Sequence, residues 1–391
     1  MYTEKNLVRI ARRKNNKKRN YLVVNQLQGK HIPVQGKTAF QMFDELANLL
    51  KKEYLNEKLL LIGFAETATA IGARVAVQLN SLYIQTTREQ IPEVEYLYFS
   101  EEHSHATEQK LVKNDIDSYI EKIDRIIFVE DEVTTGNTIL NIIRIIRKMY
   151  DKKVPFSVAS ILNGMEESAL NIYEEQGIPL HYLVKTQHDK YAMMADRYQK
   201  EGTYHVLKNA EEHSDLANEE IFGNRNLVPQ SSTSDASQEY EELLLKGYLN
   251  ARRLVDAGEY EKACEHLWAQ LMEQEKNHFS DKNILVLGTE EFMYPAIYIA
   301  ARFDEQGVNA VSHATTRSPI SVFDEEEYPL HVSNEIQSLY DGSRTTYVYD
   351  VGKYNKVYII TDSKEKGLEK DLLTVIKNAG NDNITLVRWG N

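Results

Sequence analysis

Apolar segments of strand length alternate with amphipathic segments of helix length from residue 59 to residue 186, and this alternation constrains the fold most. The sequence predicts strands at 59–62, 82–86, 125–129, 156–162 and 181–185, and helices at 68–77, 139–149 and 166–175. Strands that alternate with helices form mostly parallel sheets with helices on both faces. We therefore expect an α/β fold whose ligands bind at the carboxyl ends of the strands.

The segment from Arg125 to Thr138 combines an apolar strand, an acidic pair, a short turn and a helix start. Backbone N–H groups in such a turn can form a concave anion site, and the dipole of the following helix adds positive potential. Gly136 lets the backbone approach a phosphate closely. Hydroxyl donors come from three threonines, namely Thr134, Thr135 and Thr138. Glu130 and Asp131 lie one sugar-length away and can accept hydrogen bonds from ribose hydroxyls.

Residues 130–138 resemble the motif by which type I phosphoribosyltransferases bind 5-phosphoribosyl-1-pyrophosphate (PRPP). The resemblance implies that Glu130 and Asp131 hold the 2′ and 3′ hydroxyls of the ribose. Through PRPP they would also act indirectly on its bound Mg²⁺, the expected cofactor. It further implies that the 5′-phosphate is cradled by five residues, namely Thr134, Thr135, Gly136, Asn137 and Thr138. An ordinary strand–turn–helix with a threonine cap is the alternative.

A second resemblance lies at residues 63–72, which follow the first strand and open a helix. In the family, backbone amides here hold the pyrophosphate, so we call residues 63–67 the pyrophosphate loop. Its expected substrate contacts are Gly63, Phe64, Ala65, Glu66 and Thr67. Residues 86–113 lack clear periodicity, and the corresponding family loop closes over the active site. Within them, Arg88 is expected to contact pyrophosphate as a catalytic cation. Roles for His103 and His105 stay open.

The motif Thr316-Arg317-Ser318-Pro319 gives a closer resemblance, to phosphoribosyltransferases with a C-terminal TRSP domain. These are found in bacterial tellurite-resistance and stress-response operons. Residues 29–33 and 101–107 also resemble segments of this family. Membership implies a transferase that releases pyrophosphate, with the acceptor base or small molecule unsettled. Residues 162–164 occupy the position where many relatives contact the base, but they carry no acid or base that would specify it.

Landmarks of the first α/β region recur in the same order in the second. Residues 61–63, 71–74, 86–88, 99–102 and 130–131 align with residues 286–288, 299–302, 315–317, 323–326 and 361–362. We therefore predict that residues 283–391 form a degenerate copy of the phosphoribosyltransferase fold, which could replace a second subunit as an internal pseudo-dimer. An unrelated α/β domain is the alternative, and a homodimer stays open.

In this register the second copy has lost the phosphate-binding threonines, because Glu365, Lys366 and Glu369 replace Thr134, Thr135 and Thr138. Two carboxylates would oppose an anion at close range. A candidate second site for another ligand, or a cluster that serves packing only, consists of Thr316, Arg317, Ser318 and Asp362.

Three regions follow from these patterns. Residues 1–190 form the PRPP-binding domain, and residues 191–238 a polar connection that ends in a Ser-rich linker at 229–238. Residues 239–391 hold a helical hairpin, with helices at 240–256 and 260–276, and then the TRSP domain.

Composition narrows the function classes. The chain of 391 residues has 59 acidic and 46 basic residues, which argues against nucleic-acid binding by its whole surface. The basic segment 1–19 is either a local RNA contact or a solvated edge, and it lacks the apolar core of a secretion signal. The single Cys264 cannot form an internal disulfide, which fits a reducing cytoplasm. No apolar run is long enough to cross a bilayer.

Three functions compete. The first is a phosphoribosyltransferase. The second is a non-catalytic regulator that senses PRPP or a nucleotide and could bind RNA. The third is an enzyme similar to PRPP synthetase, which is disfavoured because the intact motif lies in the first copy.

Overall fold

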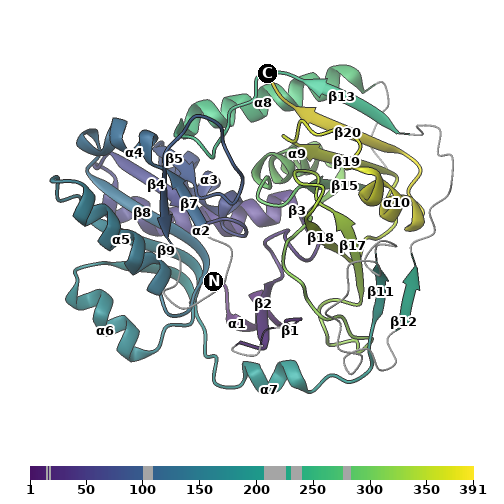
Figure 1. Ribbon diagram of the computed structural model, residues 1–391, viewed down its shortest axis with the longest axis horizontal. Coiled ribbons are helices and arrows are strands. Elements are labelled where there is room, and N and C mark those ends of the chain that lie inside the picture. The colour runs from purple at the N-terminus through teal and green to yellow at the C-terminus, as the bar shows by residue number, and fades with distance from the viewer. Residues whose placement is uncertain (15, 17–18, 100–108, 207–225, 230–239, 276–282) are drawn as a thin grey trace.

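The computed structural model describes residues 1–391 except 15, 17–18, 100–108, 207–225, 230–239 and 276–282 (Figure 1). The chain forms two halves, and each half is built on a six-stranded sheet. Among the described helices, none combines the length and the apolar character needed to span a bilayer.

The N-terminal sheet has the order β10-β9-β8-β4-β5-β14. Its strands are β10 (Leu180–Lys185), β9 (Phe156–Asn163), β8 (Arg125–Val133), β4 (Leu59–Gly63), β5 (Leu82–Gln85) and β14 (Val255–Asp256). All neighbours pair in parallel except β14, which is antiparallel to β5. Its helices are α2 (Gly36–Tyr54), α3 (Thr69–Gln78), α5 (Asn137–Met149) and α6 (Glu167–Glu175), with α5 and α6 on the outer side (Figure 1).

The C-terminal sheet has the order β13-β20-β19-β15-β16-β3. Its strands are β13 (Glu241–Leu245), β20 (Ile384–Trp389), β19 (Lys356–Thr361), β15 (Asn283–Gly288), β16 (Asn309–Ala314) and β3 (Val34–Gln35). Only β3 is antiparallel to its neighbour, β16. Its helices are α8 (Ala257–Gln274), α9 (Tyr294–Glu305) and α10 (Lys370–Asn378).

The predicted repeat is therefore present in the four central strands, because the order β9-β8-β4-β5 corresponds to β20-β19-β15-β16. The next strand along differs in its place in the chain, since β10 follows β9 whereas β13 precedes β15. In the first half Gly63 pairs with Gln85 and Val129, and in the second Gly288 pairs with Ala314 and Ile360. In both halves the next residue after each of these partners is an aligned landmark. Thr86 follows Gln85 as Thr315 follows Ala314, and Glu130 follows Val129 as Thr361 follows Ile360. Both registers agree, so the alignment holds for the strands β4, β5 and β8 against β15, β16 and β19. The aligned landmark 99–102 lies partly outside the described residues.

The two halves exchange a short edge strand. The two-residue strand β3 completes the C-terminal sheet and leads through α2 into β4, while β14 completes the N-terminal sheet and leads through α8 into β15. Helices α2, α3, α8 and α9 pack together between the sheets. The contact of α2 with α9 is so close that a Cβ on Gly36 would lie 2.2 Å from the backbone nitrogen of Ala301.

Smaller elements complete the fold. Strands β1 (Val8–Arg12) and β2 (Tyr21–Asn25) form an antiparallel pair that lies between the halves (Figure 1). Strand β6 (Tyr96–Phe99) pairs antiparallel with β7 (Gln109–Val112). A four-stranded sheet contains β12 (Asn226–Pro229), β11 (Thr203–Val206), β17 (Val332–Gln337) and β18 (Thr345–Tyr349). Short helices are α1 (Glu4–Leu7), α4 (Lys113–Tyr119), the 3-10 turn η1 (Ile120–Lys122) and α7 (Tyr191–Asp196).

Two expectations need correction. The predicted helix at 240–256 is wrong, because its first part forms β13 on the edge of the C-terminal sheet and its end forms β14. Pairing with β20 outweighs the helical spacing of its apolar residues. Residues 86–113 contain β6 and β7, whose Leu97, Phe99 and Leu111 are buried, so these parts are packed rather than open. His103, His105 and most of the Ser-rich linker lie outside the described residues.

Candidate functional site

The turn between β8 and α5 has the geometry of an anion nest. Gly136 adopts a left-handed conformation, with a φ of +71°, directly before α5. The hydroxyl of Tyr173 donates a hydrogen bond of 2.7 Å to the Gly136 carbonyl, and a Cβ on Gly136 would lie 2.5 Å from that hydroxyl. Glycine is therefore required here for both its φ and its space.

The N–H groups of this turn point to a ligand. Within the described part of the chain, the backbone N–H groups of Thr134, Thr135 and Gly136 donate no hydrogen bond, and that of Asn137 reaches only the Thr135 hydroxyl, at 3.3 Å. The first N–H groups of α5 add to this set, because a helix start leaves them without intrahelical partners. The turn can thus offer several donors to one anion.

The predicted acidic pair lies at the end of β8, before this nest. The hydroxyl of Thr67 donates a 2.8 Å hydrogen bond to Asp131, which joins the pyrophosphate loop to the acidic pair. Burial and the neighbouring charge of Asp131 raise the pKa of Glu130 well above its usual range. Burial also raises the pKa of Asp131, and the hydrogen bond from Thr67 offsets only part of this effect. In both groups, protein contacts therefore do not fully offset the cost of burying the ionised carboxylate.

The pyrophosphate loop follows β4 directly. A Cβ on Gly63 would lie 2.6 Å from the Tyr83 hydroxyl, so only glycine fits. The N–H of Phe64 is bonded to Val129 and that of Ala65 to the Thr86 hydroxyl, at 3.1 and 2.8 Å. In contrast, the N–H groups of Glu66 and Thr67 have no partner among the described residues.

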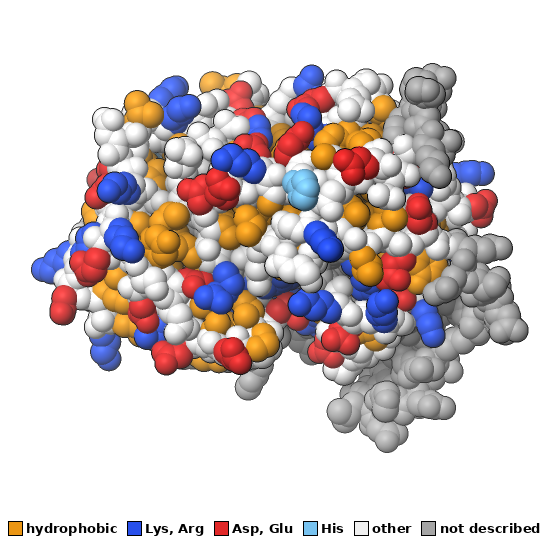
Figure 2. All heavy atoms as spheres, turned by 90° about the horizontal axis from the view of Figure 1, so that it is seen from above, with side chains coloured by type: hydrophobic (Ala, Val, Ile, Leu, Met, Phe, Trp, Pro, Cys, Tyr) orange, Lys and Arg blue, Asp and Glu red, His pale blue; other side chains and the backbone are white. Residues whose placement is uncertain are grey.

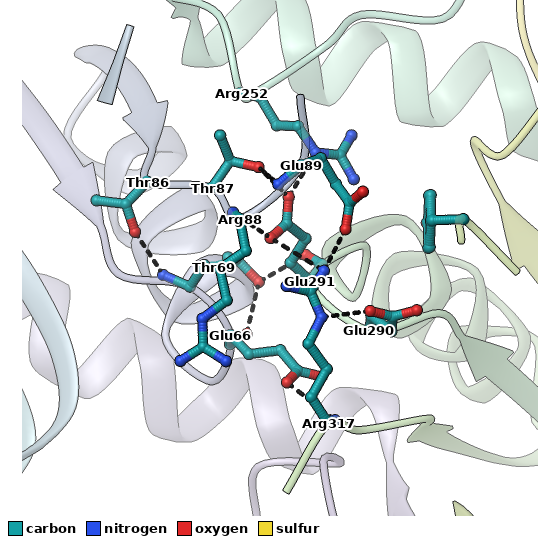
Figure 3. Close-up of polar contacts among 12 residues, drawn as sticks. Glu66, Thr69, Thr86, Thr87, Arg88, Glu89, Arg252, Glu290, Glu291 and Arg317 are labelled. Atoms are coloured by element: carbon teal, nitrogen blue, oxygen red, sulfur yellow. Dashed lines mark hydrogen bonds and ion pairs between the residues drawn. The ribbon is translucent and has the colours of Figure 1, made fainter. Parts of the chain in front are cut away.

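Arg88 lies beside this loop (Figure 3). Its backbone N–H donates to Glu291 at 3.3 Å, whereas its guanidinium makes no hydrogen bond or ion pair with the described residues and its Nε is buried. Burial lowers the pKa of Arg88, and the neighbouring Glu66 opposes this shift. The structure thus brings the predicted cation next to the predicted loop.

A pocket of about 340 Å³ opens beside the nest. Its walls are Tyr21, Thr134, Thr135, Asn137, Leu140, Gly164, Glu166, Ser168, Ala169, Ile172 and His188. The Tyr21 hydroxyl and His188 Nδ1 are 2.9 Å apart, and Arg19 is bonded to Glu132 at 2.6 Å. Burial and the charge of Arg19 lower the pKa of His188 to about 4, so this imidazole is neutral at pH 7. Tyr21 and His188 were not predicted, since 167 residues separate them and neither stands in a motif.

The basic N-terminal segment is neither a solvated edge nor an open patch in its described part. Arg12 donates to the carbonyls of Ala195 and Tyr198, and Lys14 pairs with Glu335 at 3.5 Å. These contacts of Arg12 and Lys14 give no support to an RNA site. On another face, the side of α8 and β13 seen in Figure 2, positive and negative side chains are interspersed rather than gathered by sign.

The candidate second site is engaged by protein groups. Asp362 accepts hydrogen bonds from Arg252, Tyr248 and Tyr340. The guanidinium of Arg317 is held by Glu290 and Glu89, and the Thr316 hydroxyl accepts a bond from the Ser318 N–H at 3.1 Å.

In the turn equivalent to the nest, the Glu369 carboxylate accepts from the Gly367 N–H at 2.9 Å and from Arg388 at 2.8 Å. In this turn, a carboxylate of the chain itself therefore accepts from the N–H that is equivalent to that of Gly136.

The chain matches a model described as phosphoribosyl transferase over residues 7–188 and a model described as TRSP domain, C-terminal to that transferase, over residues 254–376. No curated protein matches.

Similar solved structures include adenine phosphoribosyltransferases. That of Rhodothermus marinus is 14% identical, with 46% of this chain and 96% of that chain covered and a TM-score of 0.34. That of Thermoanaerobacter pseudethanolicus is 17% identical, with 46% and 97% covered and a TM-score of 0.35. The two family models follow one another along the chain as the predicted domains do. The chain therefore belongs to the phosphoribosyltransferase family whose members carry a TRSP domain C-terminal to the transferase domain.

Proposed function

We propose that the N-terminal half binds PRPP with Mg²⁺ and transfers its phosphoribosyl group to an acceptor, with release of pyrophosphate. The observation that carries this proposal is the set of unpartnered N–H groups at Thr134, Thr135 and Gly136 in the described structure. Donors grouped in this way at a helix start favour a phosphate, here the 5′-phosphate of PRPP.

The acidic pair suits the ribose and the metal. Glu130 and Asp131 can accept hydrogen bonds from the two ribose hydroxyls, and these bonds would compensate the burial of both carboxylates. Mg²⁺ prefers oxygen ligands and is commonly held by one or two carboxylates together with substrate phosphates. No group of three or more metal-binding side chains occurs among the described residues, so the pair fits an ion that arrives with PRPP. Bound magnesium would neutralise charge on the leaving group.

The pyrophosphate loop and Arg88 suit the leaving group. During transfer, the bond between ribose C1 and the pyrophosphate oxygen breaks, and the oxygen keeps the electron pair. The N–H groups of Glu66 and Thr67 and the guanidinium of Arg88 can stabilise the charge that develops there. The acceptor then bonds to C1 and loses its proton.

The pocket beside the nest suits a flat acceptor. Tyr21 and His188 supply ring surfaces, Leu140 and Ile172 supply apolar contacts, and Glu166 supplies a single carboxylate. The two ring nitrogens of His188 are bonded to the hydroxyls of Tyr21 and Thr186, both at 2.9 Å, so the neutral imidazole can offer its ring face to a base without adding charge.

The test is a calorimetric titration of PRPP with Mg²⁺ into the wild type and into Asp131→Asn. We expect at least about tenfold weaker binding in the variant, because a charge-assisted hydrogen bond contributes about 1.5–3 kcal/mol. The exposed Asp151→Asn, which removes an equal charge from the same half, should bind like the wild type.

Wild-type affinity in a Glu130→Gln/Asp131→Asn double variant would exclude this site. A screen of bases for pyrophosphate release then separates a transferase from a protein that only senses PRPP, since the latter would bind without turnover.

A further inference from the structure

We infer that the C-terminal half is a built-in positioning partner, in which Arg317 of the TRSP motif and Glu291 hold the pyrophosphate loop and the Arg88 segment of the transferase half in place. This inference rests on the proposed function, because it assigns a purpose to the loop that binds pyrophosphate. The residues that make these contacts are called the clasp, namely Lys30, Glu66, Thr87, Glu89, Glu291, Arg317 and Arg344. Figure 3 labels five of them, namely Glu66, Thr87, Glu89, Glu291 and Arg317.

The first anchor of the clasp is Glu66, in the pyrophosphate loop itself. Its buried carboxylate accepts from Lys30 Nζ and, at 3.2 Å, from the backbone N–H of Arg317. Lys30 is fully buried and also donates to the carbonyls of Glu290 and Thr315, at 2.6 and 2.8 Å. One ammonium group therefore fastens the loop to two backbone positions of the C-terminal half.

The second anchor lies on both sides of Arg88. On one side, Glu291 accepts from the Thr87 hydroxyl and the Arg88 N–H, and Arg252 holds Glu291 in turn. On the other side, the guanidinium groups of Arg317 and Arg344 bind Glu89. The backbone from Thr87 to Glu89 is thus fixed from the C-terminal half.

Among the described residues of this region, four of the five cations are paired with carboxylates, and the fifth, Arg88, is available to a ligand. Lys30, Arg252, Arg317 and Arg344 all form ion pairs with buried or half-buried glutamates or Asp362. Among the described residues, Arg88 is the cation of this group that forms none. Because its neighbours are fixed while its guanidinium is unpaired, Arg88 is pre-organised for an anion.

The internal repeat places equivalent residues on the two sides of this contact, but their side chains have different partners. Glu66 caps the N–H of Arg317, and in the equivalent contact Glu291 caps the N–H of Arg88, at 3.2 and 3.3 Å. The equivalent arginine side chains differ, since Arg317 is held by carboxylates and Arg88 is not. One half therefore uses its motif for support and the other keeps its motif for binding.

An ordinary interface that only joins the halves is the competing explanation. It predicts that a broken clasp costs stability alone, whereas positioning predicts a selective loss of pyrophosphate affinity. Two fragments of PRPP separate these cases. Pyrophosphate with Mg²⁺ probes the pyrophosphate loop, and ribose 5-phosphate probes the nest and the acidic pair.

The experiment compares Lys30→Met with Arg388→Met in the full chain. Both variants remove a buried cation from its carboxylate partners, Glu66 in one case and Glu369 and Glu242 in the other. Within the described residues, none of the bonds of Arg388 reaches a residue of the clasp. In Lys30→Met we expect about tenfold weaker pyrophosphate binding by calorimetry, because the loop must then be ordered on binding. Ribose 5-phosphate affinity should stay within about twofold, and Arg388→Met should bind both probes like the wild type.

Each other outcome has a defined meaning. If Lys30→Met binds pyrophosphate like the wild type, or loses both probes equally, positioning by the clasp is wrong while the proposed function stands. If the wild type binds neither probe, both proposals fall. If Lys30→Met does not fold, Lys30→Met/Glu66→Gln replaces it, because that double variant leaves no unpaired buried charge. It should still show the selective loss, and wild-type pyrophosphate affinity in it would contradict the inference.

Discussion

The two halves share the order of their four central strands but treat equivalent polar groups in opposite ways. Asp131 of the N-terminal half has the Thr67 hydroxyl as its side-chain partner, and burial keeps its pKa raised. Burial also acts on Asp362 of the C-terminal half, but Arg252 and two phenol hydroxyls outweigh it and hold the pKa of Asp362 below its usual value. The nest of the first half offers N–H groups that have no partner among the described residues, whereas Glu369 accepts from the Gly367 N–H in the second half.

This contrast shows how leaving polar groups open to a ligand lowers the stability of the free protein. A site for an exchangeable ligand must leave donors and carboxylates without full protein compensation, and buried groups in that condition destabilise the free protein. The second copy satisfies the same positions with its own side chains. It therefore gains stability, and these groups are no longer available to a ligand.

The largest expected effect concerns the two equivalent aspartates. Asp362→Asn should lower the free energy of unfolding at pH 7 by about 3–5 kcal/mol, because it breaks a buried ion pair. Asp131→Asn should leave the stability unchanged or raise it, because the ionised carboxylate is disfavoured by burial. Thermal unfolding of both variants in a calorimeter checks this. Equal losses would mean that Asp131 is as structural as Asp362.

The pH dependence sharpens the same comparison. The lowered pKa of Asp362 means that its stabilisation is present above the unfolded pKa of about 3.9 and is lost as the pH falls through the folded pKa. The effect of Asp362→Asn should therefore vanish in acid. The raised pKa of Asp131 has the opposite sign, so any gain from Asp131→Asn should be absent below about pH 4 and grow as the pH rises.

The two left-handed glycines give the next comparison. Gly367 has a φ of +90°, and the space that a Cβ would fill there is open, so Gly367→Ala should cost only the left-handed strain of about 1–2 kcal/mol. Gly136→Ala adds a contact of 2.5 Å with the Tyr173 hydroxyl and should cost more.

Ribose 5-phosphate should bind more weakly to Gly136→Ala, because the nest is distorted, and should bind normally to Gly367→Ala. Equal stability and equal affinity in the two variants would show that the turn after β8 has no special role.

Local sequence patterns could predict the part of the candidate site that lies on one strand and the turn after it. Residues 125–138 carry strand, acids, turn and helix start in a single run, and the nest has that form. The repeat could be predicted because parallel strands bring their carboxyl ends to one edge, so Gly63, Thr86 and Glu130 keep a fixed order in the chain and in space.

The exchange between the halves could not be predicted in this way. Strands β3 and β14 have two residues each, which is too short for a periodic signal, and each pairs with a sheet edge in the other half. The clasp has the same property, since 251 residues separate Glu66 from Arg317. Contacts of that kind depend on how the two halves pack against each other. The spacing of residues within a short segment carries no information about that packing.

The smallest expected effect compares two equivalent threonines. Thr87 and Thr316 are both fully buried, and each hydroxyl accepts a bond from the N–H two residues later, at 2.9 and 3.1 Å. The Thr87 hydroxyl also donates to Glu291 across the interface. Replacing either by valine should cost about 1 kcal/mol of stability through the lost hydrogen bonding.

Only Thr87→Val removes a contact of the clasp, so only this variant should bind pyrophosphate with Mg²⁺ more weakly, by about threefold. The change is small because Glu291 keeps its bonds to Arg252 and to the Arg88 N–H, which still hold the segment. Calorimetric titration of the two valine variants side by side measures the difference directly, since shape and hydroxyl loss are matched. Indistinguishable pyrophosphate affinities would mean that the hydroxyl of Thr87 contributes to folding alone, and that Arg88 is positioned by the remaining contacts.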